Sequence, residues 1–331
     1  MDYRQLGRTG LRTSVLSFGC GAVGGLMTKG DPKDQERAVA RALEMGITYF
    51  DTASIYGNGA SEENLGRILA KLRPDVLVAT KFRLKPHEHA DIPGAIRASL
   101  EASLGRMGLD SVALFQLHNR VTAVLGEDQL SVEAILGEVA PTLQKLRDEG
   151  KIRHFGITAL GETPALHRVV ASGAFDTAQI CFNALNPTAD AVVPAGYPAQ
   201  DYGQLMRAAH DGGMGTIGIR VLAGGALSGS AERHPLNMQS VEPIGSGTDF
   251  ETDVARARRF QPLLDAGAAT SLPELALRFA ISCPALSTTL VGLANLAQLE
   301  AAFSAVEKGP LPPQALRQLE IIRDRFAGER R

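Results

Sequence analysis

The 331-residue sequence contains no tryptophan, and its aromatic fraction is only 5%. It has three cysteines, Cys20, Cys181 and Cys283, which are far apart and odd in number. This pattern fits a reducing compartment better than a disulfide framework. No apolar run approaches the roughly 18 to 20 residues that span a bilayer, and the N-terminus has no apolar signal core. We therefore predict a soluble, cytoplasmic protein with no membrane partner.

The sequence also lacks an excess of charge of either sign. The 34 basic and 36 acidic residues give a formal net charge of −2, and the basic residues are not gathered into runs. This distribution argues against a nucleic-acid partner. The segment KPHEH at 85–89 offers two histidines on a short loop, which are more often solvent-exposed than ligating, and we predict no metal. We expect a monomer or a weak homo-oligomer.

A rhythm of short apolar runs and longer amphipathic segments extends along the chain. One amphipathic segment places Ile96, Leu100, Leu104 and Met107 on one stripe ahead of Gly108. The apolar runs are rich in Val, Ile, Leu or Phe, as strands buried on both faces should be. They lie at 15–19, 47–51, 75–81, 111–118, 152–158, 175–183, 214–222 and 287–293.

Eight such strands alternating with helices predict a (β/α)8 TIM barrel, formed as a single domain by residues 1–331. The alternative is an open doubly wound sheet. GCGAVGG at 19–25 lacks the G-x-G-x-x-G spacing that the dinucleotide-binding form of that sheet requires. Residues 1–10, with turn residues Gly7 and Gly10, predict an N-terminal β-hairpin. Ser61, followed by two glutamates, is expected to cap a helix.

The segment 223–251 is too long for an ordinary connection of the repeat. It is rich in Gly, Ser and Pro and follows the seventh apolar run. Long loops in compact domains are usually functional, so we expect this one to take part in binding.

Four polar residues stand at the ends of successive predicted strands. Asp51 ends the second strand and Tyr56 follows it, while Lys81 ends the third and His118 the fourth. Singly, each has an ordinary interpretation as a loop, turn or structural residue. Jointly they indicate a site, because the C-terminal ends of barrel strands meet at the face where active sites lie.

These residue types suit protonation of an oxygen on which negative charge grows. A free tyrosine is a poor acid near neutral pH, and the ammonium of Lys81 is expected to lower the pKa of Tyr56. Asp51 would hold Lys81, and His118 would orient a substrate oxygen. None of the four supplies a hydride, so a reductase would need a nicotinamide.

The sequence resembles the aldo-keto reductase superfamily over nearly its whole length. FDTASIYGNGASEENLG is similar to the first signature of that family, and LVATK and ALFQLH match the sites of its lysine and histidine. The N-terminal 21 residues, GKIRHFGITAL, AQICFNAL, LPELALRFAISCP and TTLVGLANLAQLEAAF resemble further segments. The resemblance implies that Tyr56 is the general acid, supported by Asp51, Lys81 and His118.

The resemblance also implies a cofactor, NADP(H) or NAD(H), extended over the C-terminal barrel face. The residues that it places at this cofactor are Gly19, Cys20, Asp51, Thr158, Gln179, Arg220, Leu222, Leu227, Gly229, Gly292, Ala294, Asn295 and Gln298.

Three positions in these segments depart from the family pattern. Ala159 follows Thr158 where the family has an asparagine that binds the nicotinamide carboxamide. Arg220 replaces a serine, and either pairs with a pyrophosphate or lies in a surface ion pair. Ala294 stands where many members have an arginine for the 2′-phosphate, and no Lys or Arg occurs between Arg278 and Lys308. A 2′-phosphate is best held by arginine, so NADH or dual use becomes credible unless a cation such as Arg233 substitutes.

The function predicted is interconversion of aldehydes or ketones and alcohols, with a small carbonyl compound or sugar as substrate. One alternative is an NAD-dependent sugar (aldose) dehydrogenase, which runs the same site backwards. A second is a cofactor-binding regulatory subunit, as the potassium-channel accessory proteins of the family suggest. A remote third is an aldolase that uses Lys81 as a Schiff base.

Overall fold

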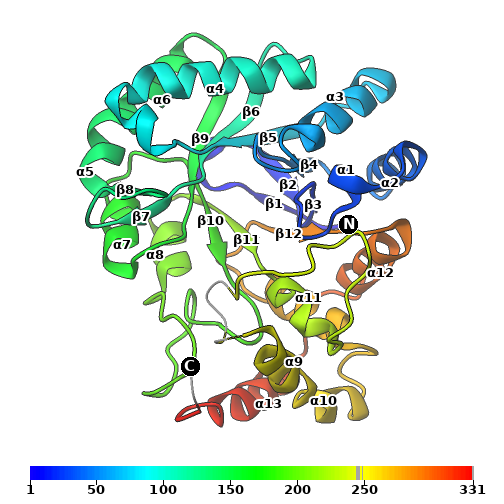
Figure 1. The fold of residues 1–331 in the computed structure, drawn as a ribbon. Helices are drawn as coiled ribbons and strands as arrows, with labels where there is room; N and C mark the ends of the chain where they lie inside the picture. Colours follow the sequence, from blue (N-terminus) through cyan, green and yellow to red (C-terminus); the bar gives the residue numbers. More distant parts are fainter. Residues whose placement is uncertain (244–246, 248, 330–331) are drawn as a thin grey trace.

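The central feature of the fold is a closed barrel of parallel strands (Figure 1). The computed structural model describes residues 1–243, 247 and 249–329. The strands follow the order β10-β11-β12-β3-β4-β5-β6-β9 around the barrel. Each predicted apolar run overlaps one barrel strand, so the prediction of a (β/α)8 barrel is confirmed. The single-domain organisation stays a prediction. The strand bounds are β3 Leu16–Gly19, β4 Tyr49–Asp51, β5 Leu77–Phe82, β6 Val112–Leu117, β9 Ile152–Thr158, β10 Thr177–Cys181, β11 Gly215–Ile219 and β12 Thr288–Gly292.

The barrel interior is filled in layers, because alternate residues of each strand point inward. The lower layer is apolar and groups Leu6, Tyr49, Ala79, Leu114 and Ile217. The layer nearer the C-terminal strand ends is polar and contains the catalytic candidates. The barrel interior therefore changes from an apolar layer to a polar layer toward the C-terminal ends of the strands.

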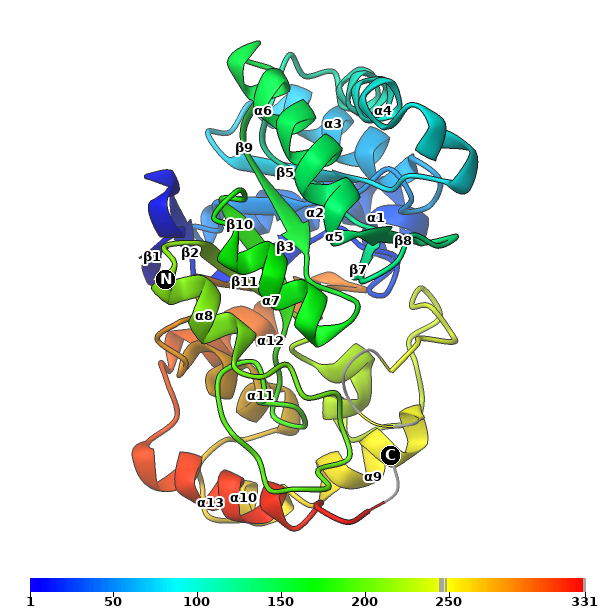
Figure 2. The same cartoon turned by 90° about the vertical axis from the view of Figure 1, so that its left-hand side faces the viewer.

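The predicted N-terminal hairpin is present as an antiparallel pair, β1 Tyr3–Gln5 and β2 Arg12–Ser14, joined through the short helix η1 Gly7–Thr9. Leu6 from the hairpin connection is fully buried within the lower layer. The Arg4 guanidinium donates hydrogen bonds to the carbonyls of Cys283 and Leu286 at 3.0 and 2.7 Å. Figure 2 places the hairpin and the β7–β8 region at opposite sides of the barrel. The hairpin therefore covers the N-terminal end of the barrel.

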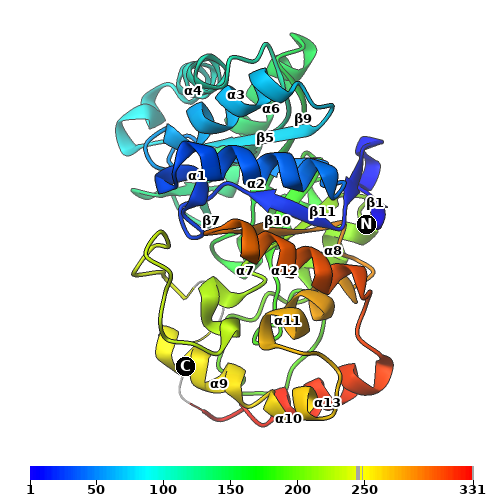
Figure 3. The same cartoon turned by 90° about the vertical axis from the view of Figure 1, so that its right-hand side faces the viewer.

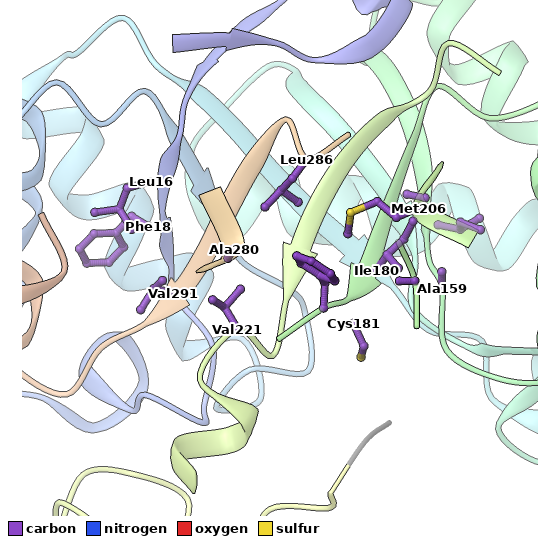
Figure 4. Close-up of a cluster of buried hydrophobic side chains, with 14 of the residues drawn as sticks. Leu16, Phe18, Ala159, Ile180, Cys181, Met206, Val221, Ala280, Leu286 and Val291 are labelled. Atoms are coloured by element: carbon purple, nitrogen blue, oxygen red, sulfur yellow. The ribbon is translucent and has the colours of Figure 1, made fainter. Parts of the chain in front are cut away.

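Helices surround the barrel and bury the outward faces of its strands. Figure 4 shows this packing, with Leu16 and Phe18 of β3 and Val291 of β12 among apolar side chains. The predicted stripe lies on α4 Ile92–Met107, and Gly108 ends that helix in the left-handed conformation. The other principal helices are α2 Pro32–Glu44, α3 Ala60–Leu72, α6 Ala140–Asp148, α7 Thr163–Ala171, α8 Leu205–Asp211, α9 Phe250–Arg258, α11 Leu272–Ile281, α12 Leu296–Glu307 and α13 Pro313–Asp324.

Two local features differ from the predictions. Helix α3 begins after Gly59, not at Ser61; the Ser61 hydroxyl instead donates to the Cys20 carbonyl at 2.9 Å and hydrogen-bonds to the Thr52 hydroxyl at 2.8 Å. The serine therefore ties two loops together within the site. The loop after β6 also contains two short paired strands, β7 Arg120–Thr122 and β8 Gln129–Ser131, which the sequence did not indicate.

The long segment after β11 crosses the barrel mouth (Figure 3). It opens with the short helix η4 Ala223–Ser228. Residues 229–243 follow, and we call them the strap. The Asn237 side-chain amide donates to the Val23 carbonyl in the turn after β3, at 3.0 Å, and Glu242 forms an ion pair with Arg120 of β7 at 2.6 Å. The strap thus connects three separate strand ends.

The structure also bears on whether the chain could span a membrane, bind a metal ion or form a disulfide. In the described part of the chain, no helix is long and apolar enough to cross a membrane. Within those same residues, no group of three or more His, Cys, Asp or Glu side chains is arranged to hold a metal ion. The three cysteines are buried and form no disulfide.

Candidate active site

A buried ion pair between Asp51 and Lys81 lies at the centre of the candidate site. Asp51 is the last residue of β4, and Lys81 is the fifth residue of the adjacent strand β5. Both side chains are at most 1% exposed. The Lys81 ammonium contacts Asp51 Oδ1 and also donates to the Thr52 carbonyl at 2.8 Å and to the Tyr56 hydroxyl at 3.4 Å. Lys81 therefore connects the carboxylate to the phenol.

The second oxygen of Asp51 is held from below by three neutral donors. Gln179 Nε2 lies 2.6 Å from Oδ2, and Gln116 Nε2 and the Tyr49 hydroxyl each lie 3.3 Å from it. All four residues are buried. Each donor comes from a different part of the interior, so the carboxylate is fixed with Oδ1 facing Lys81. Charge-assisted bonds of this kind are stronger than neutral ones.

The electrostatics of Tyr56 correct one expectation. Burial raises its pKa, Lys81 lowers it, Asp51 raises it again, and the sum lies above the ordinary value of a tyrosine. The sequence-based expectation of a lowered pKa is therefore wrong, because it considered the ammonium but neither the burial nor the carboxylate behind it. The phenol is protonated at neutral pH, as a proton donor must be.

Lys81 stays charged despite its burial. Burial lowers its pKa, but Asp51 and Tyr56 more than reverse this, so the pKa lies above its ordinary value. His118 behaves in the opposite way: burial, Lys81 and Arg83 hold its pKa well below the usual range. Its ring is therefore neutral near pH 7.

His118 directly follows β6, and its ring meets that of Tyr56 edge-on, with centroids 5.8 Å apart. Its Nδ1 is buried and has no partner among the described residues. A neutral imidazole beside the phenol offers a donor or acceptor to a substrate oxygen at that point. The structure thus brings all four predicted catalytic residues together.

The predicted nicotinamide-binding residues also lie at this face. Thr158 and Gln179 are register partners on β9 and β10. Thr158 Oγ1 is buried and has no partner in the described chain, so it is available to a bound amide. Gln179 already donates to Asp51, a contact that the sequence did not reveal. A group bound to this amide would be linked directly to the Asp51 carboxylate.

The turn after β3 closely approaches the end of β12. A Cβ on Gly19 would lie 2.8 Å from the Val291 carbonyl oxygen, and one on Gly24 would lie 2.2 Å from the Leu293 nitrogen. Only glycine fits there, because the backbone of β12 and of the residue after it occupies the space that a side chain would need. Cys20 is buried behind this turn, and burial first, then Asp51, raises the pKa of its thiol far above the ordinary range.

The segment after β12 is internally bonded. The Ala294 backbone N–H donates to Gln298 Oε1 at 2.8 Å. The Asn295 side chain accepts from the Gln298 N–H at 2.9 Å and caps α12. Gly292 ends β12 and is exposed. No cation is present in this segment, in agreement with the sequence.

The remaining predicted cofactor residues follow β11. Arg220 is half-buried and has a left-handed φ of 56°. Leu222 is half-buried, whereas Leu227 is fully buried in the core and leaves no surface that a ligand could contact. Gly229 ends η4 with φ 75°. The unpartnered Thr158 hydroxyl and the half-buried Arg220 and Leu222 are the predicted residues here that a bound nucleotide could contact.

Comparison with known proteins agrees with the fold. Residues 15–324 match the model of the Aldo/keto reductase family. The chain belongs to the aldo/keto reductase family. This family is one of oxidoreductases.

Individual relatives show moderate sequence identity to this chain. The chain is 28% identical to the L-galactose dehydrogenase of Arabidopsis thaliana over 97% of this chain and 94% of that protein. It is 33% identical to the aldo-keto reductase YhdN of Bacillus subtilis over 48% of this chain and 47% of that protein. A solved structure, the aldo-keto reductase AKR11C1 from Bacillus halodurans in its holo form, gives a TM-score of 0.72 at 22% identity. The match covers 97% of this chain and 96% of that one.

Proposed function

We propose that this aldo/keto reductase interconverts a carbonyl compound and its alcohol, using NAD(H) or NADP(H), with Tyr56 as the general acid and base. The observation that carries the proposal is the bridge made by Lys81, which contacts both the Asp51 carboxylate and the Tyr56 hydroxyl. This bridge places a fixed positive charge beside the atom that would lose a proton.

Each residue of the cluster has a distinct role in this proposal. A bound nicotinamide would supply or accept the hydride. Tyr56 gives its proton to the carbonyl oxygen, and the Lys81 ammonium stabilises the phenolate that results. Asp51 keeps Lys81 charged and pointed at Tyr56. Neutral His118 orients the substrate oxygen beside the phenol.

The neighbouring side chains of Gln179 and Thr158 support a position for the nicotinamide end of the cofactor. Thr158 Oγ1, which has no partner among the described residues, and the Gln179 side chain beside it would hold its amide. The absence of a cation after Gly292 supports NADH, or use of both cofactors, over strict use of NADPH.

A sugar is a specific second candidate for the substrate, with oxidation as the direction. The L-galactose dehydrogenase relative matches almost the whole chain, and the missing arginine at position 294 is compatible with NAD. Turnover of aldoses with NAD that exceeds reduction of simple aldehydes with NADPH would support this candidate. The reverse ranking would exclude it.

Replacement of Tyr56 by Phe tests the proposal. We expect turnover to fall about 10²- to 10⁴-fold, the usual contribution of a general acid, with nicotinamide binding retained. Tyr3→Phe is the matched control, since it removes an exposed hydroxyl whose partner is the Gly46 carbonyl. Unchanged turnover in Tyr56→Phe would refute the assignment. Cofactor binding by wild-type protein without any turnover would instead favour a regulatory subunit.

A further inference from the structure

A small cavity lies outside the barrel, between helices α11 and α13 and the loop 182–204 that follows β10 (Figure 2). Its volume is about 140 Å³. Most of its lining is apolar, and two of the lining side chains, Phe182 and Phe279, stack with their ring centroids 5.1 Å apart. None of the predicted catalytic or cofactor-binding residues lines this cavity, so it is distinct from the candidate active site.

One lining residue, Arg323, occupies a position that an apolar residue would ordinarily take. The buried residues of α13 are Ala315, Leu319 and Arg323, which recur at every fourth position. This spacing defines the face of a helix that packs on the core. An arginine at the edge of such a face usually extends its charged head into water. Arg323 does not, because only 4% of the residue is exposed.

No partner in the described part of the chain balances the charge of Arg323. Its Nε is buried and forms no hydrogen bond within those residues, and no carboxylate among them forms an ion pair with it. Burial outweighs the influence of three nearby acidic groups and lowers the pKa of Arg323. Arg256, a buried arginine beside the same helix, instead forms an ion pair with Glu329 at 3.0 Å. A buried charge without a partner is unfavourable, so an anion in the cavity would supply what Arg323 lacks.

The cavity also contains one acidic side chain, Asp190, which would oppose an anion. Its charge is already compensated, because Arg207 of α8 forms an ion pair with it at 3.2 Å. The uncompensated charge of the lining is therefore the positive charge of Arg323.

The size and walls of the cavity limit what could fill it. Its volume is close to that of an apolar cavity of about 150 Å³ that binds benzene. The stacked rings of Phe182 and Phe279, with Pro187 and Leu316, form an apolar wall suited to one ring. A guanidinium presents paired donors whose geometry matches a carboxylate.

We propose that this cavity binds a small carboxylate that carries a single ring, with the carboxylate paired to Arg323 and the ring against the apolar wall. The site lies outside the catalytic face and does not rest on the proposed function. The ordinary alternative is that water alone fills the cavity and hydrates Arg323, in which case no ligand would depend on this arginine.

Calorimetric titration of the full-length protein with benzoate tests the site, with benzamide as the uncharged ligand of the same shape. Arg323→Met removes the charge and keeps a long side chain. Ala191→Leu adds volume to the cavity lining and leaves Arg323 in place. The matched control is Arg317→Met, which removes the same charge from an exposed position of α13. Circular dichroism checks that each variant is folded.

We expect wild type and Arg317→Met to bind benzoate equally, and wild type to bind benzamide at least about tenfold more weakly. Arg323→Met and Ala191→Leu should each bind benzoate at least about tenfold more weakly than wild type. Benzoate should raise the melting temperature of wild type but not of these two variants.

Two results would overturn the proposal: wild type that binds no benzoate, or folded Arg323→Met and Ala191→Leu that bind it as well as wild type does. Benzoate that competes with a carbonyl substrate, with an affinity unchanged in Arg323→Met, would have bound at the catalytic face and would also overturn it. Arginine-dependent benzoate binding by a protein that shows no turnover would count against the proposed function and leave this cavity site standing.

Discussion

The buried pair of Asp51 and Lys81 makes a strong prediction about stability. Removal of one partner from a buried ion pair leaves an uncompensated charge and costs about 3–5 kcal/mol. Both side chains are at most 1% exposed, so solvent screening does not reduce this figure. Such a loss is a large fraction of the about 5–15 kcal/mol by which native proteins are stable.

The two single variants should differ because the partners left behind differ. In Lys81→Met the carboxylate keeps its three neutral donors, so we expect a loss near the lower end, about 3 kcal/mol. In Asp51→Asn the ammonium keeps the Thr52 carbonyl and Tyr56, so we expect about 4–5 kcal/mol. The double variant should recover at least about 2 kcal/mol of the summed losses, because no lone charge remains.

Urea unfolding followed by far-ultraviolet circular dichroism measures these free energies. This signal suits a chain that lacks tryptophan. The reasoning would be refuted if each single variant lost less than about 1 kcal/mol, or if the double variant lost the full sum.

Three further outcomes follow from neighbouring contacts. Gln116→Leu removes a donor to Asp51 but also removes Oε1, which is buried without a partner in the described chain. The loss and the gain are each about 1–3 kcal/mol, so the free energy of unfolding in urea should change little. A loss of stability above about 3 kcal/mol would contradict this. His118 keeps a depressed pKa when folded, so the unfolded chain binds more protons and stability should fall as pH drops below about 6.5, by at most about 1.4 kcal/mol per unit. His118→Asn should flatten that slope, and an unchanged slope would argue against a neutral ring. Gly25→Ala should destabilise more than Gly10→Ala, since both have positive φ but only Gly25 meets the strap backbone; equal melting temperatures would contradict the contact.

The strand ends could be predicted because their pattern is local. Apolar runs that end in Asp51, Lys81 and His118 identify both the barrel and its reactive face, since parallel strands must bring those ends together. The hairpin could likewise be predicted from the glycines near the N-terminus. These predictions depend only on periodicity and on residue type at element ends.

Contacts between distant segments were not predictable from the sequence. The approach of Gln179 to Asp51 depends on barrel stagger, and the contact of Arg233 with the Gly224 carbonyl depends on the path of an irregular loop. The predicted direction of the Tyr56 pKa shift was wrong for a related reason. Burial raises this pKa and Lys81 lowers it, and burial, the stronger influence, cannot be predicted from neighbours in the chain.

The seam of the barrel joins strands from the two ends of the chain, since β3 pairs with β12 through Leu16 and Thr289. During synthesis the first barrel strand must therefore wait for almost the whole chain before its edge is covered. Until then it presents an open strand edge, which favours association with other chains. Arg4 also lacks its hydrogen-bond acceptors until then, because these are the carbonyls of Cys283 and Leu286. Chains truncated before β12 should thus aggregate during synthesis and not accumulate as partial barrels.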